Sequence, residues 1–273
     1  MNYNYIKNKG GINIICRLIL SLSVTDDLKN SNNSDKKFLT YNSASLFQGI
    51  IMENISTDYA DILHYSQVHP YSQYTYNDGH LLKWVISVTT QEAYENIILP
   101  ISAINKFCIK HKKLWLDVTD RQIETTDYNK LIDKYYLEHC SNRYITLKFL
   151  TPASFKSNGK YVIFPTAKLI LNGILNKYNS FASDTTLDDD GLLQFIADNT
   201  EIVEYDLKSR KFHLEGISIP SFIGTVKLKI SGNNDFICLV NMLLRYGEYT
   251  GAGIKNSIGM GAYKIIDQKG DLK

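Results

Sequence analysis

The sequence has few cysteines and almost no net charge, and both shortages exclude classes of protein. Its four cysteines, Cys16, Cys108, Cys140 and Cys238, are scattered among apolar residues without C-x-x-C spacing. This pattern predicts buried free thiols in a reducing cytosol and provides no zinc site. With 30 Lys and Arg against 28 Asp and Glu, the formal net charge of +2 does not by itself indicate a nucleic-acid-binding protein.

Long apolar runs are also missing. The segment INIICRLILSLSV at residues 12–24 is interrupted by Arg17 and is too short to cross a bilayer. It also lacks the small-residue cleavage site of a signal peptide. We therefore expect a strand in a protein core, a cytoplasmic location and no membrane partner.

What the chain does have is enough material for two folded domains. It contains 273 residues, of which 44% are hydrophobic and 21% charged, as in folded soluble proteins. Nineteen tyrosines and eleven phenylalanines can serve as core packing or as stacking surfaces for bases.

The positive charge is grouped along the chain. Residues 141–182 carry basic residues and no Asp or Glu, namely Arg143, Lys148, Lys156, Lys160, Lys168 and Lys177. A second group, in a strand-like region with only Glu215 against it, contains Lys208, Arg210, Lys211, Lys227 and Lys229. Each group fits a nucleic-acid contact surface and an ordinary solvated face equally well.

The first half of the chain predicts the element order βαββαβ. After the strand at 12–24 comes a polar loop at 25–38 and a helix near 43–54 with apolar residues at helical spacing. An Asp-Gly turn predicts a hairpin between 73–76 and 81–90. A helix at 90–101 with a Thr cap, ended by Pro100, and a strand at 104–117 complete the order.

The second half repeats this order. Strands are expected at 143–150, 201–207, 222–232 and 261–266, and helices at 165–181 and 235–247, the latter closed by Gly247. The sequence therefore predicts an α+β fold of two tandem ferredoxin-like (RRM-like) domains, at 1–142 and 143–273.

Between the last helix and the last strand lies the glycine loop, GAGIKNSIGMG, residues 251–261. Its glycines are Gly251, Gly253, Gly259 and Gly261, with Lys255 between them. The spacing differs from the dinucleotide fingerprint and from a Walker phosphate loop, so nucleotide hydrolysis is not indicated. One reading is a loop that approaches a sugar-phosphate backbone closely. The other is a tight connection packed against its own sheet.

These features together resemble a known family. The helix followed by the GxG-x5-GxG loop, the doubled ferredoxin-like order, and the blocks LTPASFKSNGKYVIFP and SLFQGIIMENISTDYADILH resemble the CRISPR repeat-processing endoribonucleases, the Cas6 family of RAMP proteins. The resemblance covers nearly the whole chain and is closest to the branch that accompanies type III-A (Csm) systems.

The resemblance implies cleavage of precursor CRISPR RNA within its repeats, without metal or other cofactor, by attack of a ribose 2′-hydroxyl on the adjacent phosphate. The products would carry 2′,3′-cyclic phosphate and 5′-hydroxyl ends. His64 matches the family's catalytic histidine, whereas Met52 stands near the place of its usual tyrosine. The segment 54–82 contains no lysine to match the catalytic lysine of some members.

The chemistry itself also favours histidine, since imidazole can supply the base and the acid near neutral pH. His69 lies five residues after His64, so both can face one cleft. The remaining histidines, His80, His111, His139 and His213, are interpreted as structural. Asp58 and Asp61 look like ordinary residues of a helix's first turns, so no metal site is expected.

The residues predicted to contact RNA are Lys156, Lys160, Arg210, Lys211 and Lys255, with the four loop glycines Gly251, Gly253, Gly259 and Gly261. The expected partner is the precursor RNA repeat, with transient association with a type III-A effector complex, and the expected state is a monomer or homodimer. Two alternatives remain at this stage. One is a non-catalytic RNA-binding subunit of an effector complex, and the other is a metabolic enzyme on the same scaffold.

Overall fold

The computed structural model describes residues 14–25, 39–79, 81–138, 142–182, 186–187, 189–214 and 216–266. From residue 26 onward, the polar loop expected at 25–38 lies outside the described residues. His80, His139, Cys140 and the His111 side chain also lie outside them.

The first sheet is antiparallel and has the strand order β2-β3-β1-β5-β4. Its strands are β1 (Ile14–Val24), β2 (Tyr71–Asn77), β3 (Leu82–Val88), β4 (Lys106–Ile109) and β5 (Leu114–Asp127). The helices that accompany it are α1 (Ala44–Asn54), α2 (Thr57–Tyr65), α3 (Gln91–Ala93), a π-helical turn at Tyr94–Ile98, and α4 (Leu99–Ser102). Without the edge strand β4, this is the ferredoxin-like order that the sequence predicted.

Two predictions in this half were wrong in detail. Pro100 does not end its helix, because it stands in the first turn of α4, where a missing N–H is tolerated, and the helix runs to Ser102. The strand expected at 104–117 is a hairpin instead. Lys113 adopts the left-handed conformation, with φ 49°, and turns β4 back into the long strand β5.

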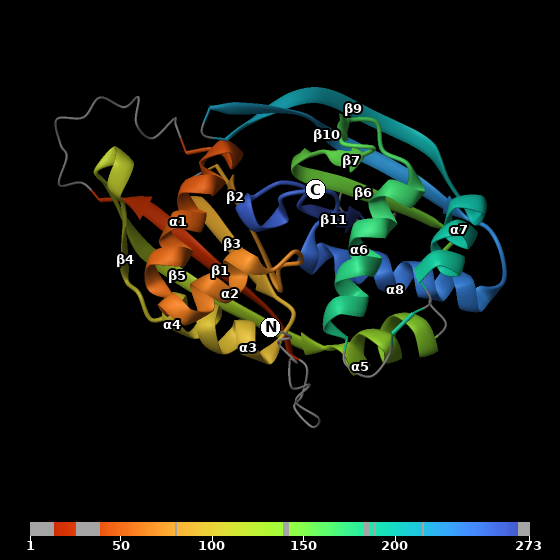
Figure 1. Ribbon diagram of the computed structural model, residues 1–273, viewed down its shortest axis with the longest axis horizontal. Coiled ribbons are helices and arrows are strands. Elements are labelled where there is room, and N and C mark those ends of the chain that lie inside the picture. Colours follow the sequence, from red (N-terminus) through yellow and green to blue (C-terminus); the bar gives the residue numbers. More distant parts are fainter. Residues whose placement is uncertain are drawn as a thin grey trace.

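The second sheet is also antiparallel, with the order β11-β6-β10-β9. Its strands are β6 (Tyr144–Ala153), β9 (Thr200–Leu214), β10 (Ile217–Ile230) and β11 (Tyr263–Ile266), and a small separate hairpin consists of β7 (Phe155–Ser157) and β8 (Lys160–Val162). The helices are α5 (Tyr128–Ile132), a π-helical turn at Asp133–Leu137, α6 (Ala167–Phe181), α7 (Asp189–Asn199) and α8 (Asn234–Thr250). The doubled ferredoxin-like architecture is therefore confirmed, and Figure 1 shows the two lobes side by side.

Gly247 does not close α8 as the sequence predicted. The helix continues to Thr250, and its C-cap is Gly251, with φ 72°. At Gly247 the helix instead packs closely on its neighbours, because a Cβ there would collide with the hydroxyl of Tyr263 and the side chain of Ile174. This glycine lets β11 approach the helix.

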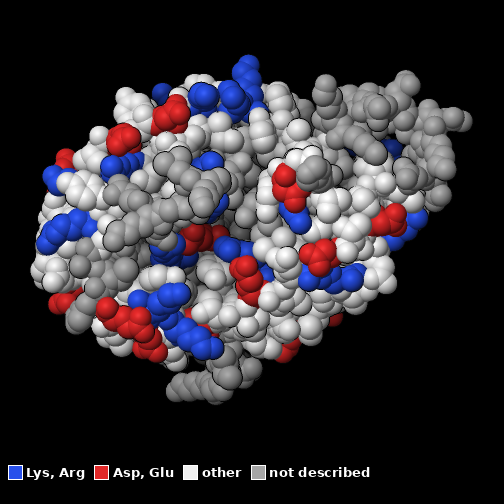
Figure 2. All heavy atoms as spheres, turned by 180° about the vertical axis from the view of Figure 1, so that it is seen from behind, with Lys and Arg blue, Asp and Glu red and all other residues white. Residues whose placement is uncertain are grey.

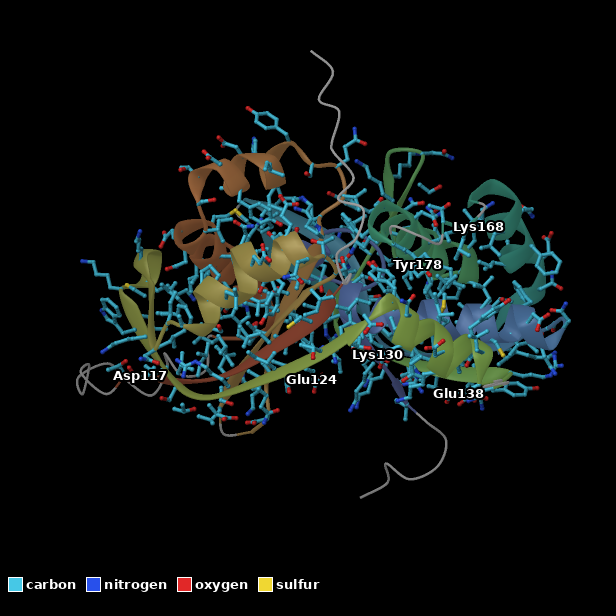
Figure 3. The ribbon with its side chains drawn as sticks, turned by 90° about the horizontal axis from the view of Figure 1, so that it is seen from below. Asp117, Glu124, Lys130, Glu138, Lys168 and Tyr178 are labelled. Atoms are coloured by element: carbon cyan, nitrogen blue, oxygen red, sulfur yellow. The ribbon has the colours of Figure 1, made fainter. Side chains whose placement is uncertain are left out.

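Each sheet buries its own core, and the two cores meet at α5. The first centres on Trp84 and Phe47, whose ring centroids lie 4.9 Å apart. Tyr128 of α5 belongs to the second core, and its hydroxyl donates a 3.0 Å hydrogen bond to the carbonyl oxygen of Thr89 in the first lobe. Figure 3 shows β5 carrying Glu124 toward α5 and Lys130, with Tyr178 of α6 at the junction of the lobes. The domain boundary at residue 142 stays a prediction.

The strands β9 and β10 extend beyond the second lobe toward the first (Figure 1). Near their tip a small third cluster buries Phe212 and Ile219 against Ile258 and Met260 of the glycine loop. No helix among the described residues is long and apolar enough to span a membrane. Of the cysteines within those residues, Cys16 is a buried free thiol, as predicted, and Cys238 is also buried, whereas Cys108 is only partly buried.

Candidate functional site

The glycine loop is folded back on itself and on β6. Most of its backbone N–H groups donate to backbone carbonyls, including Ile254 to Ser154 at 3.0 Å and Gly261 to Pro152 at 2.9 Å. The loop therefore exposes few of the N–H groups that the sequence suggested for binding a phosphate backbone.

Close packing explains why the loop is rich in glycine. A Cβ at Gly261, whose φ is 70°, would collide with the carbonyl oxygen of Ala252, and one at Gly259 would collide with the side chain of Ala44 in α1. Gly251, Gly259 and Gly261 are buried, while Gly253 is partly buried and Lys255 is exposed. The buried glycines shape the loop and allow it to touch the first lobe, and Gly253 and Lys255 remain for contact with a ligand.

Asn256 holds the loop together from its centre. Its Nδ2 donates to the carbonyl oxygens of Ala252 at 3.3 Å and Met260 at 3.0 Å. Its Oδ1 accepts a 2.7 Å hydrogen bond from Nζ of Lys177, which also donates at 2.6 Å to the carbonyl oxygen of Thr250. Lys177 therefore joins the end of α8 to the middle of the loop.

The first lobe fixes the same segment from the other side. Nε2 of Gln73 in β2 donates to the carbonyl oxygens of Ala44 at 2.6 Å and Ser257 at 3.2 Å. The neighbouring Ser72 donates from its hydroxyl to the carbonyl oxygen of Tyr249 at 2.5 Å. The glycine loop is therefore held in a fixed position against β2 and α1.

A cleft of about 570 Å³ opens where these elements meet. Its lining includes Gln48 of α1, His69 and Tyr71 around the start of β2, Lys177 of α6, and Gly253 and Lys255 of the glycine loop. No Asp or Glu is among the described residues that line it. The cleft thus combines an imidazole, a phenol and two amines from both lobes.

His69 is the histidine inside this cleft. Burial, and then the nearby Lys177 ammonium, lower the pKa of His69 below its ordinary value, so the imidazole is neutral at neutral pH. Its Nδ1 is buried without a hydrogen-bond partner among the described residues. Beside it, burial raises the pKa of Tyr71 to about 12, and the Tyr71 hydroxyl is likewise buried without a hydrogen-bond partner among the described residues. A neutral imidazole of this kind can accept a proton.

His64 lies elsewhere. It is exposed on the last turn of α2, with its ring 5.4 Å from that of Tyr65, and it is not among the residues that line the cleft. The expectation that both histidines face one cleft was therefore wrong for this conformation. The reason is that α2 ends at Tyr65 and the chain then bends, so that the cleft wall begins at Gln67 and continues through His69 to Tyr71.

The basic side chains proposed for RNA contact are exposed at the edges of the same region. Lys156 and Lys160 lie on the β7–β8 hairpin, which begins one residue after Ser154, a hydrogen-bond acceptor for the glycine loop. Arg210 and Lys211 directly precede Phe212, which packs on the glycine loop. The second basic group is only partly available. Its members Lys227 and Lys229 form ion pairs of 3.4 and 3.0 Å with Glu204 and Glu201.

One face of the molecule mixes the two signs of charge. On the face shown in Figure 2, Lys and Arg lie among Asp and Glu, and no broad positive field forms there. Arg17 of β1 is 3.4 Å from Glu124 and also donates at 2.7 Å to the carbonyl oxygen of Glu248. The arginine therefore ties β1 to α8 and serves the junction of the lobes.

Sequence reasoning missed Lys177, Asn256 and Tyr71 as members of the site. Lys177 was counted in the basic block but was not singled out. Its position offered a signal, because it follows Gly173 by four residues and both then lie on one face of α6. A lysine next to a core-facing stripe, opposite a glycine-rich loop, favours a partly buried amine, as found. Asn256 and Tyr71 carried no comparable signal.

Within the part of the chain that the structure describes, no group of three or more His, Cys, Asp or Glu side chains could hold a metal ion.

Comparison with known proteins gives a consistent result. The profile of the family described as CRISPR-associated endoribonuclease Cas6 matches residues 147–263. A protein of that name from Streptococcus thermophilus is 30% identical over 223 residues, which cover 82% of this chain and 91% of the relative. One of the same name from Mycobacterium tuberculosis is 31% identical over 220 residues, covering 80% of this chain and 69% of the relative.

Solved structures share the fold. A Cas6 product complex matches with a TM-score of 0.75 at 15% identity, covering 93% of this chain and all (100%) of the other. Thermus thermophilus Cas6 matches with a TM-score of 0.69 at 17% identity, covering 94% of this chain and 100% of the other. At this identity the likeness establishes the two ferredoxin-like domains and nothing about individual side chains.

Proposed function

The chain belongs to the Cas6 family of CRISPR-associated endoribonucleases, and we propose that it cleaves precursor CRISPR RNA within its repeats. The observation that best supports this is the cleft in which His69 of the first lobe faces Lys177 and Lys255 of the second. A neutral base beside two amines suits a reaction on a phosphodiester, because the amines attract the phosphate while the imidazole accepts a proton.

In the proposed reaction the RNA supplies its own nucleophile. His69 accepts the proton of a ribose 2′-hydroxyl, whose oxygen attacks the adjacent phosphorus. The bond from phosphorus to the 5′-oxygen breaks, and an acid protonates that oxygen. The products carry a 2′,3′-cyclic phosphate and a 5′-hydroxyl. We assign the acid to His64, which is exposed on the last turn of α2 and therefore open to contact with RNA.

Binding and cleavage are assigned to different groups. Lys156, Lys160, Arg210, Lys211 and Lys255 contact phosphates around the cleft, and Gly253 lets the RNA approach the loop backbone. The buried glycines Gly251, Gly259 and Gly261 act through the shape of the loop.

The direct test uses repeat RNA with and without a single 2′-deoxyribose at the cleavage site, each in the presence of EDTA. We expect the all-ribose RNA to be cut in EDTA, and the deoxy RNA to be bound but not cut, since the nucleophile is missing. Cutting of the deoxy RNA, or full inhibition by EDTA, would contradict this mechanism.

A second candidate function is a non-catalytic RNA-binding subunit of a CRISPR effector complex. The exposed position of His64, outside the cleft, is the observation that favours it. Binding of repeat RNA with no cleavage under any condition would support this alternative. For the endoribonuclease we propose a cytoplasmic monomer or homodimer that associates transiently with a type III-A effector complex.

A further inference from the structure

Lys177 is a partly buried cation, and no carboxylate among the described residues pairs with it. Loss of solvation lowers its pKa to about 7, and no carboxylate contributes to that shift. Its two hydrogen-bond acceptors, the Thr250 carbonyl and the Asn256 amide oxygen, are both uncharged. An ammonium that has lost part of its solvation and has no acidic partner is stabilised when an anion joins it.

The surroundings add positive charge to this position. The titratable groups that line the cleft around Lys177 are His69 and Tyr71 from the first lobe and Lys255 from the glycine loop, and none is an acid that is ionised at neutral pH. An ammonium has three donors, and Thr250 and Asn256 accept two hydrogen bonds from it. One donor is therefore left for a further acceptor.

We propose that Lys177 binds a backbone phosphate of the RNA directly, next to His69, and so forms an internal phosphate site at the floor of the cleft. This inference rests on the proposed function for the identity of the ligand. The phosphate supplies the missing counter-charge and accepts the third hydrogen bond. Lys177 then places the phosphorus beside the base and stabilises the negative charge that develops on the phosphate oxygens.

The site differs in kind from the exposed lysines around it. Lys156 and Lys160 are solvated side chains on a hairpin, whereas Lys177 is held in place by two hydrogen bonds of 2.6 and 2.7 Å. A preorganised cation contributes more to the transition state than a mobile one, because it needs no reorganisation during the reaction.

The experiment compares Lys177→Met, Lys177→Arg and Lys168→Met. Lys168 is the matched control, since it lies on the same helix but is exposed and contacts Gln194 (Figure 3). The salt dependence of binding is measured with repeat RNA that carries the single 2′-deoxyribose. The logarithm of the binding constant K falls linearly with the logarithm of the salt concentration, and each phosphate contact to single-stranded nucleic acid contributes about 0.7 to the magnitude of that slope. We expect Lys177→Met to lower the slope by about this amount, and the other two variants to preserve it.

Single-turnover cleavage of all-ribose RNA gives the second measurement. We expect Lys177→Met to slow cleavage at saturating RNA by roughly 10²-fold or more, in the range that mutagenesis finds for loss of one such donor. Lys177→Arg should retain more activity than Lys177→Met, because arginine keeps a positive charge at this position.

The variant Asn256→Ala tests whether Lys177 has a purely structural role. It removes the side chain whose hydrogen bonds hold the glycine loop together but leaves the Lys177 charge in place. If Lys177 binds phosphate, Asn256→Ala keeps the slope that Lys177→Met loses. Equal loss of slope in both variants, or an unchanged slope and rate in Lys177→Met, would overturn the proposal. If the wild-type protein cuts no repeat RNA, the proposed function fails, while the slope still decides the role of Lys177.

Discussion

Gln73 in β2 donates a hydrogen bond of 3.2 Å from Nε2 to the carbonyl oxygen of Ser257 in the glycine loop. The two residues are far apart in sequence and come from different lobes. Their contact fixes the loop relative to the segment that carries His69. The cleft is therefore a product of how the lobes are joined.

Gln73 itself should be important for stability. Besides its two donor bonds, its Oε1 accepts a 2.9 Å hydrogen bond from the indole N–H of Trp84. Gln73→Ala leaves these groups buried without partners, at a cost of about 1–3 kcal/mol for each unsatisfied group. Urea unfolding should show this loss, whereas Gln122→Ala on the exposed part of β5 should change the free energy of unfolding by less than about 0.5 kcal/mol. Equal stability of the two variants would contradict the bridging role.

His64→Ala should separate cleavage from binding. We expect the cleavage rate to fall by about 10²- to 10⁴-fold, which is the usual contribution of an acid or base, while affinity for repeat RNA stays nearly unchanged because phosphate contacts supply it. His213→Ala, which removes an exposed histidine of β9, is the control and should cut at the normal rate. A normal rate in His64→Ala would remove His64 from the mechanism but leave the fold intact.

The pH dependence should reveal His69. Burial and Lys177 lower its pKa below the ordinary value of 6.5, so the imidazole keeps its neutral, proton-accepting form down to a lower pH. The acidic limb of the kcat/KM profile, which reports the free enzyme, should therefore lie below pH 6.5. Lys177→Met removes a nearby positive charge, so the limb should move to higher pH. It should still lie below its position for an unperturbed histidine, because burial is the larger cause. A limb at or above the ordinary value in the wild-type protein would exclude His69 as the base.

Neutralising the exposed basic residues should weaken binding without affecting sequence preference. Replacing Lys156, Lys160, Arg210, Lys211 and Lys255 together by Gln should reduce the slope of log K against log salt by about 0.7 for each phosphate contact that is lost. Lys130→Gln is the control, since Lys130 pairs with Asp127 at 3.1 Å on α5. If the fivefold variant keeps the wild-type slope, these residues do not contact the RNA.

Two glycines with similar backbone angles should respond differently to alanine. Gly261 and Gly159 have φ values of 70° and 75°, but a Cβ at Gly261 would strike the Ala252 carbonyl, whereas a Cβ at Gly159 would meet only open space. Gly159→Ala should cost about 1–2 kcal/mol for the left-handed conformation alone. Gly261→Ala should cost clearly more and should also impair RNA binding. Thermal unfolding of both variants measures the difference, and equal costs would show that the loop relaxes around the added methyl group.

Much of the fold could be predicted from local sequence. The strand around Leu18, the helix at 44–54 and the Asp-Gly hairpin each follow from apolar periodicity or turn chemistry within a short window. The predicted boundaries of helices and strands were wrong where tertiary packing overrode a local sequence signal. Gly247 looked like a helix end, but Tyr263 and Ile174 pack against it, and the helix continues. Lys113 carried no glycine-like signal for its left-handed turn.

The sequence by itself determined the two ferredoxin-like units, the glycine loop and the presence of histidines beside a helix end, because these depend on residue type and spacing over short distances. Only the tertiary structure decided that His69 enters the cleft while His64 stays outside it. It also decided that the loop glycines serve close packing and that Lys177 is a partly buried cation in the cleft wall. Such outcomes depend on contacts between lobes more than one hundred residues apart, where burial and the absence of a counter-charge arise from three-dimensional neighbours that no local pattern records.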